Sequence, residues 1–465
     1  MKKSRIIGLV LTAGACIVLA IAGTRLGQNS SCAIEDAEGN SLATVSIKQG
    51  EYVLDCGEDD WAYADLAFHE ASGILAEEKQ LTREEAEQEL VRSGVTVRTY
   101  YQKEIQEDLT EAMNTSGEVA LSDSAGAVSD TEGRLLACRS FSVNQNGRNY
   151  VTYPTWAGST MKPLCVYGPA LEENKICWSS MEEDSPCMQV KNEAGELADW
   201  PVNTVEYTYS MKTMAQALKE SNNAIAVKTL KNLGVADALD WMQERFHYTV
   251  DEERRRLEEE GEDQILGNVA LGYLEAGVTV EQMLENYQVF VSGGMRRTLR
   301  AVDYIEDKDG VRRTEPDMPQ QIFSEDTAYI VNRMLKGVVE NGGTGEAAAL
   351  EGVDLCGKTG TSSDYRDNWF IGITPQYLCC VWYNCETEEA HAGNEAVAVC
   401  REVISRLPDQ TGLEFVCPAE VEEIAYCTRT GLRAGEYCAE TAVGYYKKGS
   451  FTQECNCQPV LTIKK

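Results

Sequence analysis

Two strand-turn-strand patterns, far apart in the chain, constrain its fold more than any other feature. The first covers residues 126–138 and the second residues 369–383, each with a short turn in its middle. Between them, helical patterns cover residues 211–233 and 326–339, and another follows over residues 394–407. Hairpins at both ends of a helical middle predict an α+β fold, with an antiparallel sheet flanked by helices.

The charge of the chain excludes one class of function. The 465 residues carry 42 Lys and Arg against 75 Asp and Glu, so the formal net charge is −33 at pH 7. Proteins that hold nucleic acid through phosphate contacts carry the opposite charge, so nucleic acid is not an expected partner. Only three histidines occur, His69, His247 and His391, and none is near a serine-centred or cysteine-centred motif. A His-based catalytic triad is therefore not expected.

The N-terminus predicts export. Residues 1–5 are basic, and residues 6–23 contain no charged side chain, which is about 27 Å of helix, enough to cross the apolar core of a bilayer. The basic flank places residues 1–5 in the cytoplasm and the rest outside. We therefore expect a single-pass anchor in the cell membrane over residues 1–23, with the body of the protein extracytoplasmic. A cleaved secretory signal, with Ala20-Ile21-Ala22 at its cleavage site, is the alternative.

The cysteines leave two interpretations open. There are 17 of them, and an exported chain rich in cysteine is normally disulfide-bonded. However, Cys379 and Cys380 are adjacent, Cys455 and Cys457 are separated by one residue, and no CxxC pair occurs. Free thiols in a reducing habitat are the alternative to disulfides. Without CxxC spacing, no structural zinc or other metal site is expected.

The segment Ser159-Thr160-Met161-Lys162-Pro163 is the first motif that indicates chemistry. Three residues along a helix bring Ser159 and Lys162 onto one face, and Pro163 is tolerated only in a first turn, so the helix is expected to begin near Ser159. A desolvated lysine beside a second cation loses its proton readily and is able to activate a serine. Taken alone, the motif is also explained by an N-capping serine followed by a surface lysine.

Two more segments indicate a catalytic function only when they are considered together with the first motif. Ser221-Asn222-Asn223 lies between two helical pieces and reads either as a helix break or as a proton-relaying hydroxyl beside a substrate-orienting amide. Residues 352–359 match the phosphate-binding pattern GxxxxGK[ST], but no buried strand precedes them and a loop follows, so a P-loop is not expected. We expect an edge strand over residues 353–361 instead, with Lys358 as the second cation and Gly360 giving a substrate backbone close access.

The order SxxK, SxN, KTG resembles that of the serine penicillin-recognising enzymes. The flanking segments Gly342-Gly343-Thr344-Gly345 and Asp367-Asn368-Trp369-Phe370-Ile371-Gly372 make residues 95–405 similar to the transpeptidase domain of class A penicillin-binding proteins. Residues 71–109 also resemble the connector that precedes this domain in class A members. Those members carry a glycosyltransferase domain before the connector, but only about forty residues separate the apolar run from the connector here. Polymerase activity is thus not expected. Ala157 stands where the family usually has proline, and Cys356 is an unusual neighbour of the KTG strand.

The resemblance implies a role for each motif residue. Ser159 would attack the penultimate carbonyl of a D-Ala-D-Ala stem peptide, with Lys162 accepting its proton, and the N–H groups of Ser159 and Thr361 would form the oxyanion hole. Ser221 would pass a proton to the departing D-Ala, and Asn223 would bind the substrate amide. The terminal carboxylate would be held by the KTG strand, through Lys358, Thr359, Gly360 and Thr361. An amine from a neighbouring stem would resolve the acyl-enzyme.

The implied function is a serine D,D-transpeptidase that crosslinks peptidoglycan stem peptides, is covalently inhibited by β-lactams, needs no cofactor and works beside a separate glycosyltransferase. Two alternatives remain: a D,D-carboxypeptidase or β-lactamase using the same site, and a noncatalytic β-lactam-sensing scaffold. The expected divisions are an anchor or signal at 1–23, a tether and helical connector at 24–94, the transpeptidase domain at 95–408 and a small Cys-bearing segment at 409–465.

Overall fold

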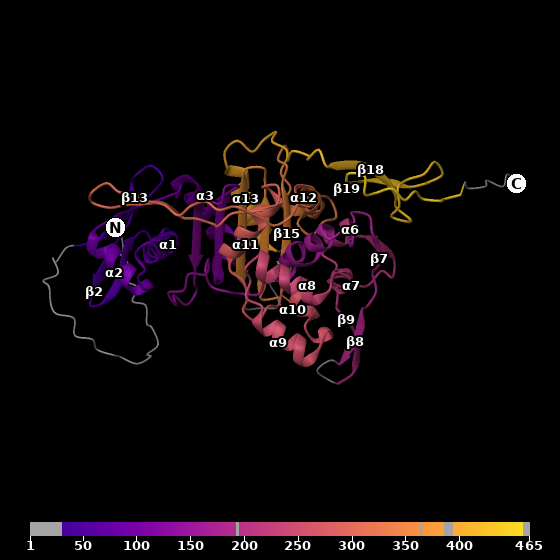
Figure 1. Cartoon of the computed structure of the whole chain (residues 1–465), viewed down its shortest axis with the longest axis horizontal. Coiled ribbons are helices and arrows are strands. Elements are labelled where there is room, and N and C mark those ends of the chain that lie inside the picture. The colour runs from indigo at the N-terminus through magenta and orange to yellow at the C-terminus, as the bar shows by residue number, and fades with distance from the viewer. Residues whose placement is uncertain (1–29, 192–194, 363–364, 386–393, 459–465) are drawn as a thin grey trace.

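The computed structural model describes residues 30–191, 195–362, 365–385 and 394–458. Figure 1 shows a layered central body, with a smaller sheet-and-helix part toward the N-terminus and a slender hairpin extension toward the C-terminus. The anchor or signal expected over residues 1–23 lies outside the described residues. Among the helices of the described ranges, none is both long and apolar enough to span a bilayer.

The central sheet has five antiparallel strands in the order β15-β16-β17-β5-β6, which confirms the expected fold class. Both predicted hairpins are present, and each supplies adjacent strands because a short turn joins neighbours in an antiparallel sheet. The strands are β5 (Ser124–Asp130), β6 (Leu135–Phe141), β15 (Cys356–Thr361), β16 (Asp367–Ile373) and β17 (Tyr377–Asn384).

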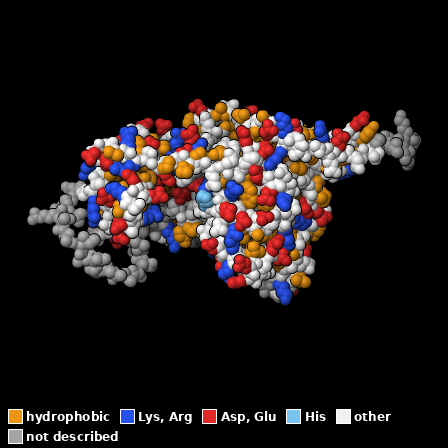
Figure 2. Space-filling model, in the orientation of Figure 1, with side chains coloured by type: hydrophobic (Ala, Val, Ile, Leu, Met, Phe, Trp, Pro, Cys, Tyr) orange, Lys and Arg blue, Asp and Glu red, His pale blue; other side chains and the backbone are white. Residues whose placement is uncertain are grey.

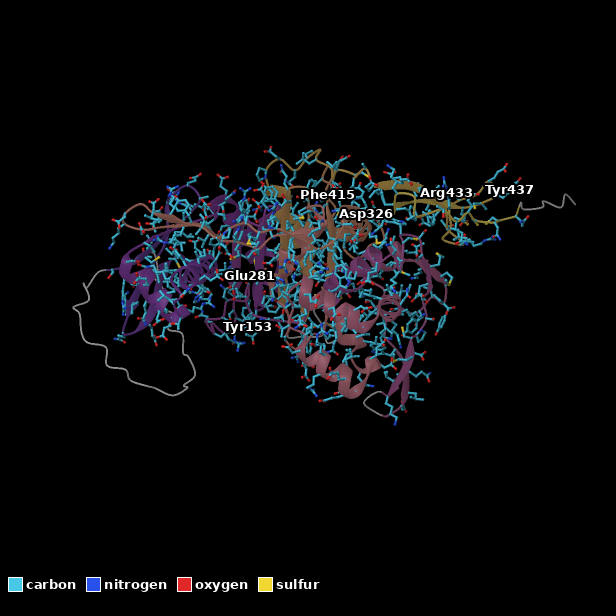
Figure 3. All side chains as sticks on the ribbon, in the orientation of Figure 1. Tyr153, Glu281, Asp326, Phe415, Arg433 and Tyr437 are labelled. Atoms are coloured by element: carbon cyan, nitrogen blue, oxygen red, sulfur yellow. The ribbon has the colours of Figure 1, made fainter. Side chains whose placement is uncertain are left out.

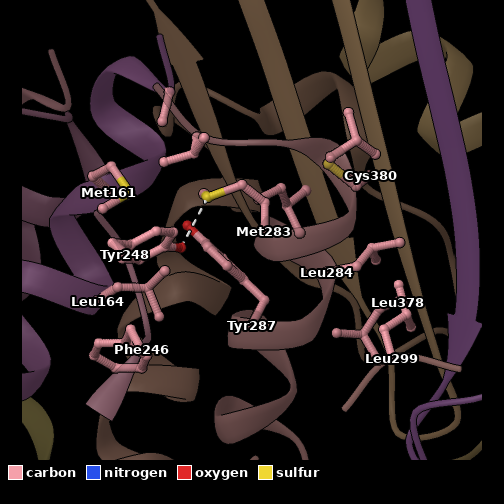
Figure 4. Packing of buried hydrophobic residues seen from close by; sticks show 14 of the residues in the cluster. Met161, Leu164, Phe246, Tyr248, Met283, Leu284, Tyr287, Leu299, Leu378 and Cys380 are labelled. Atoms are coloured by element: carbon pink, nitrogen blue, oxygen red, sulfur yellow. Dashed lines mark hydrogen bonds between the residues drawn. The ribbon is translucent and has the colours of Figure 1, made fainter. Parts of the chain in front are cut away.

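Alternation along the strands sends side chains to two separate cores. Cys380 packs with one buried cluster and its neighbour Cys379 with another, since successive strand residues point to opposite faces. On one face lie α3 (Lys103–Thr115), α4 (Gly117–Leu121) and α13 (Glu395–Arg406), and on the other lies α11 (Val280–Tyr287). Figure 4 shows Met283 and Tyr287 of α11 in the core that also contains Cys380 of β17.

The remaining helices form a layer that carries two of the three motifs. The predicted helices over residues 326–339 and 394–407 are confirmed as α12 and α13, and the acidic run at 251–263 begins with the surface helix α9. This layer contains η1 (Gly158–Met161), η2 (Pro163–Tyr167), α5 (Gly168–Glu172), α6 (Met214–Lys219), α7 (Asn223–Leu233), α8 (Val235–Asp240), η3 (Trp241–Arg245), α9 (Asp251–Glu260), η4 (Glu262–Gln264), α10 (Leu266–Leu271), η5 (Gln288–Phe290) and α12 (Glu325–Val339). The short turn η6 (Glu346–Ala348) packs against α13.

The N-terminal part is built around a second sheet. Within the expected tether and helical connector at 24–94, residues 32–56 form three strands of a six-stranded sheet. Two strands of this sheet come from residues 302–313, more than two hundred positions later. The elements are β1 (Cys32–Glu35), β2 (Ser41–Lys48), β3 (Glu51–Cys56), α1 (Trp61–Lys79), α2 (Arg83–Ser93), β4 (Thr96–Thr99), β12 (Val302–Glu306) and β13 (Arg312–Arg313). The expected capping box of Thr82 and Glu85 opens α2.

Four two-stranded ribbons complete the described part of the chain. They pair β7 (Met181–Glu183) with β10 (Met211–Thr213), β8 (Met188–Lys191) with β9 (Leu197–Trp200), β11 (Met295–Arg296) with β14 (Gln320–Gln321), and β18 (Val421–Cys427) with β19 (Thr441–Lys447). The last ribbon forms the C-terminal extension, and β19 also packs against α12. On the face shown in Figure 2, acidic and basic side chains are intermixed.

Candidate active site

The serine and lysine of the first motif lie on consecutive turns. Ser159 is half-buried in the 3-10 turn η1, and the backbone N–H of Lys162 donates to the Ser159 carbonyl. Pro163 then opens the π-helical turn η2, so the prediction that a helix begins near Ser159 is confirmed. Tyr287 of α11 fixes the turn from behind, because its hydroxyl donates to the Thr160 carbonyl at 2.6 Å. The nucleophile candidate is thus held on a rigid element.

The buried Lys162 ammonium joins the first motif to the second. Its Nζ donates to the Ser221 carbonyl at 2.7 Å and to Asn223 Oδ1 at 2.6 Å, and it lies 3.4 Å from Ser221 Oγ. Asn223 Nδ2 donates to the Val202 carbonyl at 2.7 Å. The Asn223 carboxamide therefore holds Lys162 and the backbone near Val202 in this structure.

Ser221 also contacts the third motif. Lys358 Nζ donates to Ser221 Oγ at 2.9 Å and to the Thr359 carbonyl at 2.8 Å. The Ser221 hydroxyl consequently lies between the ammonium groups of two fully buried lysines. Ser221 has a φ of +54°, a left-handed conformation that a serine adopts only when its surroundings hold it there. The fold thus brings the three motifs together around one hydroxyl.

Lys358 belongs to the outer strand of the central sheet, as predicted. β15 ends the sheet, and the GxxxxGK[ST] match lies partly inside this strand and opens no helix, so the segment is not a P-loop. A Cβ on Gly360 would lie 2.5 Å from the Ala157 carbonyl oxygen and 2.8 Å from Thr160 Cγ2. Glycine is required at 360 because the strand packs directly on the turn that carries Ser159, which is a different reason from the predicted access for a substrate backbone.

Gly158 and Gly272 extend this close packing. A Cβ on Gly158, whose φ is +55°, would lie 2.6 Å from the Thr361 carbonyl oxygen, and one on Gly272 would lie 2.2 Å from the Gly158 carbonyl oxygen. The Gly158 N–H also donates to the Gly272 carbonyl. Gly272 terminates α10, and no sequence pattern indicated that it contacts the turn that carries Ser159. The spacing between Ser159 and Thr361 is set by these backbone contacts.

The family is decided by comparison with known proteins. Residues 124–405 match the model of the penicillin-binding protein transpeptidase domain, which is more than half of the chain. The chain belongs to this family. It is 28% identical over 313 residues to penicillin-binding protein 1A of Clostridium botulinum, a match that covers 63% of this chain and 36% of the relative. Identity to penicillin-binding protein 1F of Bacillus subtilis is also 28%, over 83% of this chain and 52% of the relative.

Solved structures support the same fold. The D,D-transpeptidase domain of a peptidoglycan glycosyltransferase from Eggerthella lenta aligns with a TM-score of 0.62 and 19% identity, over 82% of this chain and 98% of that one. Penicillin binding protein 3 of Mycobacterium tuberculosis aligns with a TM-score of 0.62 and 18% identity, over 84% of this chain and 99% of that one. The chain spans between about a third and a half of the length of the curated relatives above.

Burial makes both lysines of this transpeptidase-family site weak bases. Desolvation lowers the pKa of Lys358 to about 7. Desolvation also lowers the pKa of Lys162 well below its ordinary value, and the Lys358 charge lowers it further. Because the Lys358 charge opposes protonation of Lys162, a neutral Lys162 beside a charged Lys358 is the state that fits proton transfer from a serine.

We expect acylation by a penicillin to follow a bell-shaped pH profile. The second-order rate constant should rise as Lys162 loses its proton and fall as Lys358 does, with the midpoint of the alkaline limb near 7. Stopped-flow measurement with a chromogenic β-lactam checks this. In Lys358→Arg the alkaline limb should disappear because a guanidinium stays charged. A wild-type rate constant that is flat from pH 6 to pH 10 would contradict the assignment.

Replacing Gly272 by alanine is expected to slow acylation about 10-fold to 100-fold, because the new Cβ pushes the Ser159 turn away from β15. The rate of covalent labelling by penicillin is the readout. Gly261→Ala is the matched control: Gly261 also has a positive φ, +90°, but a Cβ there meets nothing within 4 Å. Equal rates in the two variants would show that the close packing does not position Ser159.

Asp184 anchors the second motif, and sequence reasoning missed it. Its buried carboxylate accepts from Asn222 Nδ2 and from Asn203 Nδ2, both at 2.8 Å, and Asn203 Oδ1 in turn accepts from the Asn223 N–H at 2.9 Å. Lys212 Nζ lies 3.3 Å from the carboxylate. Burial raises the pKa of Asp184, but the hydrogen bonds from Asn222 and from Thr208 lower it by more, so the carboxyl stays ionised.

Asp184→Asn is expected to lower the free energy of unfolding by about 2–4 kcal/mol. Asparagine keeps one acceptor oxygen, but it places an NH₂ group where the other carboxylate oxygen accepts from Thr208, and it removes the negative charge beside Lys212. The acylation rate should fall with it, since the turn at Ser221 loses its anchor. Urea unfolding and penicillin labelling measure the two effects. The control Asp263→Asn removes an exposed carboxylate that pairs with Lys231, and a loss no greater than in that control would refute the role of Asp184.

Proposed function

We propose that this chain is a serine D,D-transpeptidase that crosslinks peptidoglycan stem peptides through an acyl-enzyme on Ser159. The observation that carries the proposal is the buried Lys162, one turn from Ser159, whose pKa is lowered by burial and by the Lys358 charge. A lysine in this state is a base at neutral pH. The transpeptidase domain family to which the chain belongs supports the same conclusion.

In the proposed acylation step, neutral Lys162 accepts the Ser159 proton as the serine oxygen attacks the penultimate carbonyl of a D-Ala-D-Ala stem. The negative charge that develops on the carbonyl oxygen is stabilised by the N–H groups of Ser159 and Thr361. Such donors act most strongly when they are fixed in place beforehand. The packing of Gly158 against Thr361 supports this assignment, because it fixes the two backbone segments relative to each other.

Departure of the terminal D-Ala needs a proton at its nitrogen. Ser221 is the proposed relay, because its hydroxyl contacts both Lys162 and Lys358 and so connects the base to the leaving group. Lys358, Thr359, Gly360 and Thr361 line the proposed carboxylate site, where the Lys358 charge would attract the terminal carboxylate. Thr344 Oγ1 and Thr359 Oγ1 lie 2.6 Å apart and keep the Thr359 hydroxyl in one orientation. For Asn223 to bind a substrate amide, its bond to Val202 or to Lys162 would have to open.

The proposal extends to the setting of the enzyme. Residues 1–23 would anchor it in the cell membrane, with the catalytic domain at 95–408 outside the cytoplasm, after the connector at 24–94 and before the segment at 409–465. A separate glycosyltransferase would supply the glycan strands. The basic start followed by an uncharged run supports the anchor.

An assay with the purified full-length chain tests the proposal. A stem pentapeptide ending in D-Ala-D-Ala is incubated with an excess of an amine acceptor, and products are separated by mass. We expect D-Ala release, an amide-linked product and inhibition of both by penicillin. Release of D-Ala without the amide product would indicate a D,D-carboxypeptidase. Steady turnover of penicillin would indicate a β-lactamase. If neither the pentapeptide nor penicillin acylates the protein, the chain is a noncatalytic scaffold.

A further inference from the structure

Four cysteines of the C-terminal extension converge on one point. Cys427 ends β18, Cys438 lies between β18 and β19, and Cys455 and Cys457 follow β19. Their four Sγ atoms all lie within 4.8 Å of one another, and all four are free thiols in the structure. Figure 3 labels Arg433 and Tyr437 on the extension that carries them.

The spacing of the sulfurs fits a single metal ion. Four thiolates arranged tetrahedrally at about 2.3 Å from a zinc ion lie about 3.8 Å from one another. The Cys427 and Cys457 sulfurs are 3.8 Å apart and those of Cys455 and Cys457 are 3.2 Å apart. In a disulfide, by contrast, each sulfur has one partner at about 2.05 Å. Mutual proximity of all four indicates one shared centre.

The four cysteines come from three separate segments of the chain, and backbone hydrogen bonds position these segments. The Cys427 N–H donates to the Leu432 carbonyl and the Cys455 N–H to the Arg433 carbonyl, each at 2.8 Å. Gly431, with a φ of +71°, makes the tight turn after Cys427, and its N–H donates to the Cys427 carbonyl at 2.8 Å. The ligands are therefore placed by the backbone and do not depend on flexible loops alone.

Hydrogen-bond donors outside the four-cysteine cluster face three of its sulfurs. Arg429 Nη2 lies 3.0 Å from Cys457 Sγ, Thr430 Oγ1 lies 3.3 Å from Cys455 Sγ, and the Gly435 N–H donates to Cys438 Sγ at 3.3 Å. Four thiolates around a divalent cation leave a net charge of −2, which these donors partly offset. Hydrogen bonds of this kind orient and stabilise metal-bound thiolates.

The extension also needs support that its small core does not give. The buried apolar cluster of the extension itself consists of Tyr426, Tyr446 and Phe451, and a two-stranded ribbon is marginally stable alone. Units of this size are commonly held by disulfides or by a metal ion. The extension is docked on the body through Ser179, which donates to the Gly431 carbonyl at 2.6 Å and accepts from the Tyr446 hydroxyl at 2.8 Å.

We propose that Cys427, Cys438, Cys455 and Cys457 bind one Zn²⁺ as a closed, structural four-thiolate site. The sequence predicted no metal because ten, sixteen and one residues separate successive ligands and no CxxC pair occurs. Pairing of β18 with β19 supplies the proximity that the spacing lacks. The site is separate from the catalytic machinery, so it stands or falls independently of the proposed transpeptidase activity.

Metal analysis of the full-length chain, purified without chelator, tests the proposal. We expect about one zinc per chain, falling below about 0.1 in the double variant Cys438→Ser/Cys457→Ser, since a closed site needs four ligands. The control Cys417→Ser removes an exposed thiol outside the cluster and should keep its zinc. Iron in place of zinc, or a metal content unchanged in the double variant, would overturn the assignment.

Two further measurements do not depend on the folding of a variant. Wild-type protein stripped of metal and titrated with Co²⁺ should develop intense thiolate-to-cobalt absorption that saturates at one equivalent and is abolished by Zn²⁺. Mass spectrometry after alkylation should find the four cysteines blocked by metal and alkylated once the metal is removed. Disulfide pairs among these cysteines, or four thiols that alkylate freely in the purified protein, would refute the zinc site.

Discussion

Lys162→Met is expected to lower the rate constant for acylation by penicillin at least about 1000-fold, because general-base catalysis contributes about 10²-fold to 10⁴-fold. Lys162 directly follows the turn that carries Ser159, and its side chain contacts Ser221 and Asn223. Thermal stability should not fall. The folded-state pKa of Lys162 is lowered, so below its unfolded pKa burial of this group opposes folding, and methionine relieves that cost. Stopped-flow acylation and calorimetry measure the two effects.

The control for Lys162→Met is Lys231→Met, which removes an exposed lysine paired with Asp263. It should acylate at the wild-type rate. Acylation by Lys162→Met within 10-fold of wild type would show that another group takes the Ser159 proton, and a large loss of stability would show that Lys162 is a structural cation.

Lys358→Met is expected to slow acylation about 100-fold to 1000-fold, for two reasons. The variant lacks the proposed partner of the substrate carboxylate and the donor to Ser221 Oγ, and interactions with preorganised charges of this kind are worth several kcal/mol. Its second effect is on Lys162. Because the Lys358 charge lowers the pKa of Lys162, removing that charge should raise it and move the acid limb of the pH profile to higher pH.

The pH profile separates this prediction from simple damage to the site. A misfolded or displaced β15 would lower the rate at every pH without moving the acid limb. Lys358→Arg, which keeps a charge, should leave the acid limb close to its wild-type position. An acid limb that stays in place in Lys358→Met would contradict the proposed coupling of the two lysines.

Sequence patterns predicted the elements that are locally determined. The hairpins at β5/β6 and β16/β17 have short turns between apolar strands, and α12 and α13 have regular helical periodicity. The edge strand β15 was expected as the alternative to a P-loop, because a loop and not a helix follows the GxxxxGK[ST] match. Each of these predictions depends on neighbours within about twenty residues along the chain, which is the range over which periodicity and turn chemistry operate.

Features that depend on distant segments were not predictable. β1 is four residues long, and its sheet is completed by β12 and β13 from a part of the chain more than two hundred residues away. Short strands carry too few residues to show alternation. The cysteines of the proposed zinc site were not recognised for another reason, since none of their spacings is the CxxC pair that usually marks such a site.

The candidate site shows the same division. The three motifs were identified from their order, and in the structure Lys162 of the first and Lys358 of the third both contact Ser221 of the second. Asp184 and Gly272 gave no signal, because their roles consist of contacts made with residues far along the chain: Asp184 with Asn222, and Gly272 with Gly158. The hydrogen bond between Lys162 and Asn223 was not predictable either, since a carboxamide in a turn has many possible partners.

The central claim is that Ser159 is the nucleophile of a functioning acylation site. Incubation of the purified chain and its Ser159→Ala variant with a fluorescent penicillin, followed by a denaturing gel, tests it most directly. We expect a stable fluorescent band for the wild type that is absent in the variant. A band of equal intensity in Ser159→Ala, or none in the folded wild-type protein, would contradict it.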